Sequence, residues 1–266
     1  MTRGALVVAL TAGALTAFQG GAHAEEVPPG IIGGKPAVGE FSFITALNWD
    51  PDGRHRFRCG GSLVDEQWVL TAAHCVYNQS TSQPYDPALF DVRVGSNDRT
   101  SGGSTARVTE VHVHPDYWNT PNDRQSDVAL LKLDQPVDQE PLIIGDEEAE
   151  PRDRIRVLGW GITAVGQTEA PVHLNQLDTR VIDDAQCVIG GIYDLTEGDL
   201  CVDDKKNPAT GSCSGDSGTP AVRWEDGHWE LVALESRSVN GCGVSPNVMP
   251  SAAAHENWIS NLIAAG

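Results

Sequence analysis

The sequence predicts an all-β protein that ends in a single helix. Its apolar runs are short, rich in Val, Ile, Leu and Trp, and separated by Gly, Pro, Asn and Asp. This pattern is typical of a β-sandwich or a β-barrel. Helical periodicity is confined to the C-terminus, where Trp258, Ile259, Leu262 and Ile263 recur at helical spacing and Ser251 is a candidate N-cap.

The apolar runs are the predicted strands, and no internal repeat is visible among them. A stretch rich in acidic residues and proline, residues 136–151, is the best candidate for a connection between two halves of the chain. The predicted strands are residues 43–47, 62–64, 68–71, 91–94, 107–113, 128–133, 155–158, 177–181, 220–224 and 229–234.

The N-terminus has the features of an export signal. Met1-Thr2-Arg3 is a short basic start, residues 5–18 are mostly apolar, and Ala22-His23-Ala24 is a small-x-small cleavage site. This order predicts a secretory signal peptide over residues 1–24. A buried N-terminal helix is the alternative, which the glycines of this region disfavour. No other stretch approaches the roughly 20 apolar residues of a spanning helix. We expect a secreted, extracellular protein, and the signal and the high Ala and Gly content look bacterial.

Charge and cysteine content limit the partners. The formal net charge is −19, which disfavours nucleic acid and anionic membranes as partners. An even number of cysteines in an exported protein predicts disulfides, although several connectivities are possible. Zinc is the alternative, but no C-x-x-C or H-x-x-x-H pair exists, so we expect no metal and no cofactor. The cysteines are Cys59, Cys75, Cys187, Cys201, Cys213 and Cys242.

Three motifs carry residues suited to nucleophilic catalysis. His74 lies in Thr-Ala-Ala-His-Cys, Asp127 opens the apolar run 128–133, and Ser217 lies in Gly-Asp-Ser-Gly. Each has an ordinary alternative: a structural or surface histidine, a turn aspartate, or a tight turn around a serine. Together, well separated and in the order His, Asp, Ser, they match the order of a chymotrypsin-type triad.

With these three, Ile31-Ile32-Gly33-Gly34 and Gly159-Trp160-Gly161 resemble the landmark motifs of the chymotrypsin/trypsin family, in family order. The resemblance runs from Ile31 to the C-terminal helix. It implies a trypsin-like serine peptidase domain over residues 31–266, built as two six-stranded antiparallel β-barrels with the active site between them. It also implies the disulfides Cys59–Cys75, Cys187–Cys201 and Cys213–Cys242.

The resemblance also implies the roles of the site residues, since the general template for this triad is this same family. Ser217 is expected to attack the scissile carbonyl, His74 to act as the base, and Asp127 to orient the histidine. Backbone N–H groups of Gly215 and Ser217 are expected to form the oxyanion hole, and Ser236 to support the aspartate. We therefore expect a serine endopeptidase acting on proteins or peptides.

Activation by cleavage is a further implication of the resemblance. A cut between Gly30 and Ile31 would free an amine that pairs with Asp216, which makes residues 25–30 an activation propeptide. Gly30 stands where many precursors have Arg or Lys, so the activating protease is unknown. We expect a monomer, and no calcium site in residues 95–107, which lack the glutamates that trypsins use.

The specificity pocket departs from the family pattern. Gly211 stands where trypsin-like members have Asp, so their charge-pairing group is missing. Glu235 either faces the pocket and attracts Lys or Arg, or points elsewhere and is satisfied by neighbours. Arg237, where the family usually has Trp, is expected to be solvated. The pocket residues implied by the resemblance are Gly211, Ser212, Glu235, Ser236, Ser238 and Asn247.

A non-catalytic family member that uses the same fold for binding is the alternative function. Inactive relatives usually lack a triad residue, whereas His74, Asp127 and Ser217 are all present here. The sequence therefore favours the enzyme.

Overall fold

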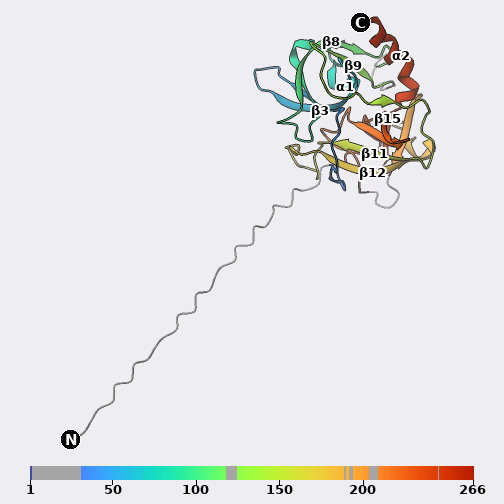
Figure 1. Ribbon diagram of the computed structural model, residues 1–266. Coiled ribbons are helices and arrows are strands. Elements are labelled where there is room, and N and C mark those ends of the chain that lie inside the picture. The colour runs from blue at the N-terminus through green and yellow to red at the C-terminus, as the bar shows by residue number, and fades with distance from the viewer. Residues whose placement is uncertain (2–30, 118–124, 189, 192–193, 204–208, 245) are drawn as a thin grey trace.

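Two groups of strands make up the protein, one from each half of the chain (Figure 1). The computed structural model describes the whole chain except residues 2–30, 118–124, 189, 192–193, 204–208 and 245. The predicted signal peptide (1–24) and propeptide (25–30) therefore lie outside the described residues, apart from Met1.

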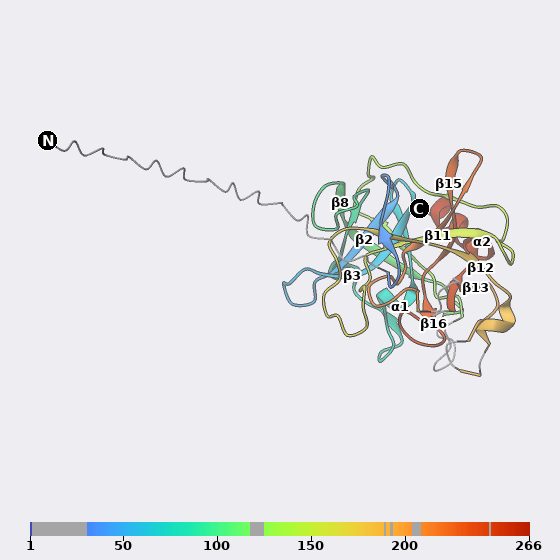
Figure 2. The same cartoon turned by 90° about the horizontal axis from the view of Figure 1, so that it is seen from below.

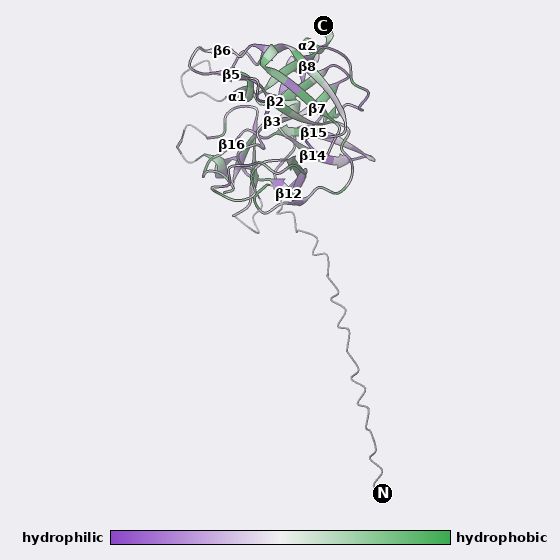
Figure 3. Ribbon diagram, turned by 90° about the vertical axis from the view of Figure 1, so that its left-hand side faces the viewer, coloured by the Kyte–Doolittle hydropathy of each residue, from purple (hydrophilic) through white to green (hydrophobic). Residues whose placement is uncertain are grey.

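The first half is a closed barrel in the order β2-β3-β4-β9-β8-β7, with antiparallel pairing throughout. Buried and partly buried residues alternate along β7, as expected of a strand with one face in a core, and its polar and apolar residues can be followed in Figure 3. The strands are β2 (Ile44–Trp49), β3 (Arg56–Asp65), β4 (Trp68–Thr71), β7 (Phe90–Val94), β8 (Ser104–Val113) and β9 (Ala129–Leu133).

The second half is a nine-stranded sheet, and the six-stranded second barrel implied by the family is not confirmed. The sheet follows the path β10-β15-β14-β11-β12-β13-β17-β16, with β1 added beside β12. Among the described residues β10 and β16 are the two ends of this path, and β10 pairs with β15 in parallel. The strands are β1 (Lys35–Pro36), β10 (Ile143–Ile144), β11 (Arg154–Gly159), β12 (Asn175–Val181), β13 (Asp199–Asp203), β14 (Pro220–Glu225), β15 (His228–Leu234), β16 (Arg237–Ser238) and β17 (Asn247–Pro250).

Few helical segments accompany the strands. The predicted C-terminal helix is confirmed as α2 (Ala252–Ala265), and the Ser251 side chain accepts a hydrogen bond from the Ala254 N–H, as an N-cap does. No helix in the described part of the chain is long and apolar enough to cross a membrane. The other short elements are α1 (Ala73–Val76), the 3₁₀ turns η1 (Pro87–Leu89) and η2 (Asp184–Cys187), and the hairpin β5 (Tyr77–Asn78) with β6 (Gln83–Pro84).

All of the predicted strand runs overlap strands of the structure. The prediction missed β13 and β17, and also the two-residue strands. The run Asp199–Asp203 has an acid at each end, and Asn247–Pro250 ends in proline, so neither shows the alternation of a strand. The connection expected over residues 136–151 does separate the barrel from the second sheet, apart from the short β10 within it.

One large core cluster spans both halves. Leu130 of the barrel, Leu231 of β15 and Ile259 of α2 belong to this cluster, and none of the three is more than 1% exposed. α2 lies over β15, so the C-terminal helix contributes to the same buried volume (Figure 2). A second cluster, which includes Ile31, lies within the second sheet. The halves are therefore held together by shared apolar burial.

The disulfide pairing implied by the family is the pairing in the structure. Cys59–Cys75, Cys187–Cys201 and Cys213–Cys242 are bonded, with Cα–Cα distances of 6.3, 5.8 and 4.6 Å. No cysteine is free. Each bond joins segments close in sequence, so the cross-links hold local loops beside the site.

Val92→Ala in β7 should lower the unfolding free energy by about 2 kcal/mol, because it removes buried methyl groups and leaves a cavity. Val92 is fully buried, whereas Val165 is 77% exposed, so Val165→Ala is the matched control. Urea unfolding monitored by fluorescence measures both. Equal losses in the two variants would contradict the barrel interior assigned here.

Candidate active site

His74 is held by the short helix α1, directly after β4. Its backbone N–H donates to Asp127 Oδ1 at 2.8 Å, and its Nδ1 lies 2.7 Å from Asp127 Oδ2. An ionised carboxylate can only accept, so Nδ1 carries the proton of this bond and leaves Nε2 as the free ring nitrogen. The His74 side chain is 19% exposed, which leaves its outer edge open to solvent.

Asp127 lies two residues before β9 and is completely buried. The Ser236 hydroxyl donates to Asp127 Oδ2 at 2.6 Å, so a residue of the second half holds a carboxylate of the first. Burial opposes ionisation, but the positive potential of His74 and the hydrogen bonds from His74 and Ser236 keep the pKa of Asp127 well below its usual range. The group is therefore a fixed buried anion beside the imidazole.

Ser217 lies on a tight turn that contacts the barrel. Its carbonyl oxygen accepts from the Gly60 N–H of β3 at 2.8 Å, and Cys75 Sγ lies 3.9 Å from the same oxygen. A Cβ added to Gly218 would come 2.8 Å from the Ala72 nitrogen, just before α1. Glycine at this position lets the serine turn approach the segment that carries His74.

Asp216 is a second buried carboxylate, and glycines surround it. Its Oδ1 accepts from the Gly161 N–H at 2.7 Å, and its Oδ2 accepts from the Cys213 N–H at 2.9 Å. A Cβ on Gly159 or Gly161 would lie 2.1 Å from a carboxylate oxygen, which explains why both flank Trp160. Burial raises the pKa of Asp216 to about 7, although the two backbone hydrogen bonds oppose the shift.

The predicted partner of Asp216 does not contact it in this uncleaved chain. Ile31 is fully buried in the core of the second sheet, and the following residue, Ile32, forms a bridge with Gly211. No hydrogen bond or ion pair joins Ile31 to Asp216 in the described residues, as expected while the Ile31 nitrogen is still an amide. Asp216 is thus a buried acid without a counter-charge.

A cleft of about 750 Å³ opens beside the serine turn. Gly215 and Ser214 line it together with Phe57 and Arg58 of β3. Gly215 has a φ of 101°, a left-handed conformation that glycine adopts without strain. The lining of this cleft includes Gly215 but neither Ser217 nor His74.

The residues implied for the specificity pocket gather near Gly211. A Cβ added to Gly211 would lie 3.0 Å from the amide nitrogen of Asn247, and the Ser238 hydroxyl is 2.5 Å from Asn247 Oδ1. Asn247 is only 4% exposed. Its side chain therefore occupies the space beside Gly211.

Glu235 and Ser212 are buried polar residues with unsatisfied atoms. Both are 3% exposed, and in the described part of the chain neither Glu235 Oε2 nor Ser212 Oγ has a hydrogen-bond partner. Burial raises the pKa of Glu235 well above its usual range. The nearby Ser212 hydroxyl opposes the shift, and Asp216 adds to it. Glu235 therefore favours its protonated form.

Arg237 is buried, so the expectation that it would be solvated is wrong. Its side chain reaches Asp199 Oδ2 at 2.6 Å, and its Nη1 lies 3.2 Å from the Ser236 hydroxyl. A buried guanidinium needs a carboxylate nearby, and Asp199 supplies it. Sequence reasoning missed this pair because the two residues are far apart in the chain and join only through the pairing of β13, β17 and β16.

The site residues offer no ready metal centre. Cys59, His74 and Cys75 lie close enough to share an ion. The two cysteines, however, are bonded to each other and have no thiolate to donate. His74 is left as a single ligand and is already bound to Asp127.

Comparison with known proteins shows the family of the chain. The sequence pattern of the trypsin family matches residues 31–259. The chain belongs to the trypsin family. It is 28% identical over 260 residues to the CLIP domain-containing serine protease B4 of Anopheles gambiae, covering 88% of this chain and 70% of that protein. It is also similar to the structure of neuropsin, a serine protease of mouse brain, with a TM-score of 0.73 and 26% identity over 88% of this chain and all of that one.

Family membership makes the protein a serine endopeptidase of the chymotrypsin/trypsin family. The structure brings His74, Asp127 and Ser236 into one hydrogen-bonded chain and sets the Ser217 turn against the same part of the barrel. Five residues implied for the specificity pocket are buried or partly buried: Gly211, Ser212, Glu235, Ser238 and Asn247.

The uncleaved chain should lose stability as pH rises from about 4 to about 7. Unfolded Asp216 ionises near 3.8, whereas folded Asp216 stays protonated up to about 7, so the folded state binds the extra proton in this window. The shift corresponds to about 4 kcal/mol. Urea unfolding at several pH values should give a decline that is smaller in Asp216→Asn, in which the raised pKa of Glu235 still contributes.

Asp138→Asn is the control for that measurement, because Asp138 is exposed. This variant should keep the decline of the parent chain. The stability of the parent chain is compared with that of Asp216→Asn over the same pH window. If the difference stays flat or rises with pH, the assignment of Asp216 as a buried acid without a counter-charge is wrong.

Proposed function

We propose that this protein is a secreted serine endopeptidase that hydrolyses peptide bonds through Ser217, His74 and Asp127, and that it is made as a precursor activated by cleavage between Gly30 and Ile31. The observation that carries the proposal is the hydrogen-bonded chain from Ser236 through Asp127 to His74 Nδ1. It leaves the other nitrogen of His74 available as a base.

The chemistry follows from this arrangement. A serine hydroxyl is a weak nucleophile at neutral pH and needs a base within reach. In the proposed mechanism, His74 Nε2 takes the Ser217 proton as Oγ attacks the carbonyl carbon, and later gives it to the leaving amine. The imidazolium that forms is stabilised by the ionised Asp127, whose burial makes the interaction stronger than in water. Water then hydrolyses the acyl-enzyme.

The oxyanion is assigned to the backbone N–H groups of Gly215 and Ser217. A substrate in the cleft beside Gly215 would lie close to these donors. Donors of this kind act where charge develops in the transition state, and losing one costs roughly 3–4 kcal/mol in a related mechanism. Here the donors are backbone groups, so their position depends on the turn that contains Asp216.

Activation is assigned to the unpaired acid at Asp216. Cleavage before Ile31 creates an ammonium group, and an ammonium beside a buried carboxylate relieves the cost of burying its charge. Because Asp216 precedes Ser217 directly, forming this pair would fix the turn that carries the nucleophile and the oxyanion donors. Gly30, the residue before the cut, gives a trypsin-like activator no basic side chain to recognise.

A fluorophosphonate probe tests the proposal. The secreted protein should begin at Ile31 and take up one adduct, mapped to Ser217 by mass spectrometry. Ser217→Ala should take up none, and Ser80→Ala, which alters an exposed serine, should label like the parent. The reason is that the proposed mechanism assigns a base and oxyanion donors to Ser217 and not to Ser80.

A chain that begins at Ile31 and never labels would contradict the proposal and favour a binding protein with a protease fold. Labelling of the uncleaved chain at the rate of the processed one would contradict the activation step alone.

A further inference from the structure

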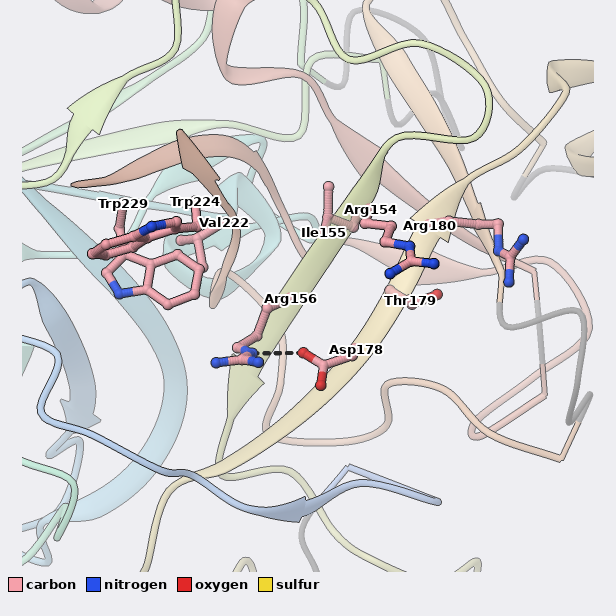
Figure 4. A pocket seen from close by; sticks show the side chains of 9 residues that line it. All are labelled: Arg154, Ile155, Arg156, Asp178, Thr179, Arg180, Val222, Trp224 and Trp229. Carbon is pink, nitrogen blue, oxygen red and sulfur yellow. Dashed lines mark hydrogen bonds and ion pairs between the residues drawn. The ribbon is translucent and has the colours of Figure 1, made fainter. Parts of the chain in front are cut away.

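The second sheet carries an open groove of about 550 Å³ on its outer face (Figure 4). Neighbouring strands β11, β12 and β14, with Trp229 of β15, form its walls. The groove contains no residue of the proposed triad, cleft or specificity pocket. Its side chains therefore have no part in the peptidase chemistry described above.

The groove is positively charged in a strongly acidic protein. Arg154, Arg156 and Arg180 line it against one acid, Asp178, while the whole chain has a formal charge of −19. Asp178 is already paired, with Arg156 at 2.6 Å and with Lys35 at 3.3 Å. Among the described residues no ion pair engages Arg154 or Arg180. Two guanidinium groups in this groove are therefore available to an anion.

The two arginines are also neighbours across the strand pair. Arg154 and Arg180 are direct partners in the antiparallel pairing of β11 and β12, so their side chains leave the sheet on the same face. Like charges directly opposite in a sheet are destabilising. A guanidinium group can donate two parallel hydrogen bonds to one carboxylate or sulfate group. Two adjacent guanidinium groups therefore suit a ligand that carries such anionic groups. On its other side Arg180 lies opposite Asp203 of β13, and no ion pair joins these two residues in the described part of the chain.

Aromatic side chains form the other end of the groove. Trp224 is 57% exposed and packs edge-on against Trp229, with ring centroids 5.0 Å apart. Figure 4 shows the two indole rings on one side, the Arg156–Asp178 pair in the middle, and Arg154 and Arg180 on the other side. Arg156 also lies 5.3 Å from the Trp229 ring centroid. The groove thus offers an apolar ring face next to a separate pair of positive charges.

We propose that this groove binds an acidic polysaccharide, with a sugar ring on the exposed face of Trp224 and carboxylate or sulfate groups on Arg154 and Arg180. A chain of anionic sugars alternates flat C–H faces with charged groups, which matches the order of the groups in the groove. An acidic peptide would use the arginines but has no flat face for Trp224. Because charges are screened within about 8 Å at physiological salt, the groove can attract an anion despite the acidic surface elsewhere.

Binding of defined polymers at about 0.15 M salt tests the proposal, with titration calorimetry as the measurement. Polygalacturonate presents carboxylates and dextran sulfate presents sulfates. The polymer that binds more tightly identifies the anionic group that the groove prefers. Arg154→Gln with Arg180→Gln should weaken binding about tenfold or more, because charge-assisted hydrogen bonds are lost. Trp224→Ala should also weaken binding. Neutral dextran should bind neither the parent protein nor the variants.

Matched controls separate the groove from general charge and from misfolding. Arg54→Gln with Arg107→Gln removes the same charge from exposed positions elsewhere and should leave binding unchanged. The Arg154/Arg180 double variant should melt no lower than the parent, because it removes a repulsive pair. Hydrolysis of a short peptide should be unaffected in all of these variants.

Failure of both acidic polysaccharides to bind would overturn the proposal, as would unchanged binding in the Arg154/Arg180 variant. Poly-L-glutamate that binds more tightly than either polysaccharide, with no effect of Trp224→Ala, would overturn it in favour of an acidic peptide.

Discussion

The burial of Asp127 between the two halves is the constraint on which the site depends. Its carboxylate takes hydrogen bonds from His74 on the barrel side and from Ser236 on the other side, at 2.7 and 2.6 Å. An ionised group removed from water is stable only when such partners surround it. The position of the imidazole is therefore tied to the packing of both halves, through the core cluster that they share.

Two further buried charges organise the serine side of the cleft in different ways. Arg237 forms an ion pair with Asp199 through Oδ2, and it contacts the same Ser236 hydroxyl that binds Asp127. The Asp216 carboxylate accepts hydrogen bonds from two backbone N–H groups, and the neighbouring glycines leave space for its oxygens. In the uncleaved chain Arg237 already has its counter-charge. Asp216 lacks one, and a new amine at Ile31 would supply it.

Much of the fold could be predicted from the sequence, because short apolar runs between turn residues mark strands whatever their partners. Strands such as β17, with a proline at its end, carried no such signal. The open path of the second sheet depends on long-range pairing, including the parallel pair of β10 and β15, which periodicity does not encode. The motifs located His74, Asp127 and Ser217, since these residue types recur at fixed places in the family.

The parts of the site that could not be predicted depend on tertiary contacts. Arg237 looks like a surface residue until β13 brings Asp199 beside it. The unsatisfied oxygen of Glu235 is visible only once its burial is known. The groove of Arg154 and Arg180 arises from strand register, because a shift of one residue would send the two side chains to opposite faces.

The most direct test of the central role of Asp127 is the single-turnover acylation rate of the chain beginning at Ile31, measured with an activated ester at neutral pH. In Asp127→Asn the rate should fall by about four orders of magnitude, the size of loss that the family template gives for this substitution, with the protein still folded. An acylation rate within about tenfold of the parent would contradict the account, since it would mean that His74 works without the buried anion.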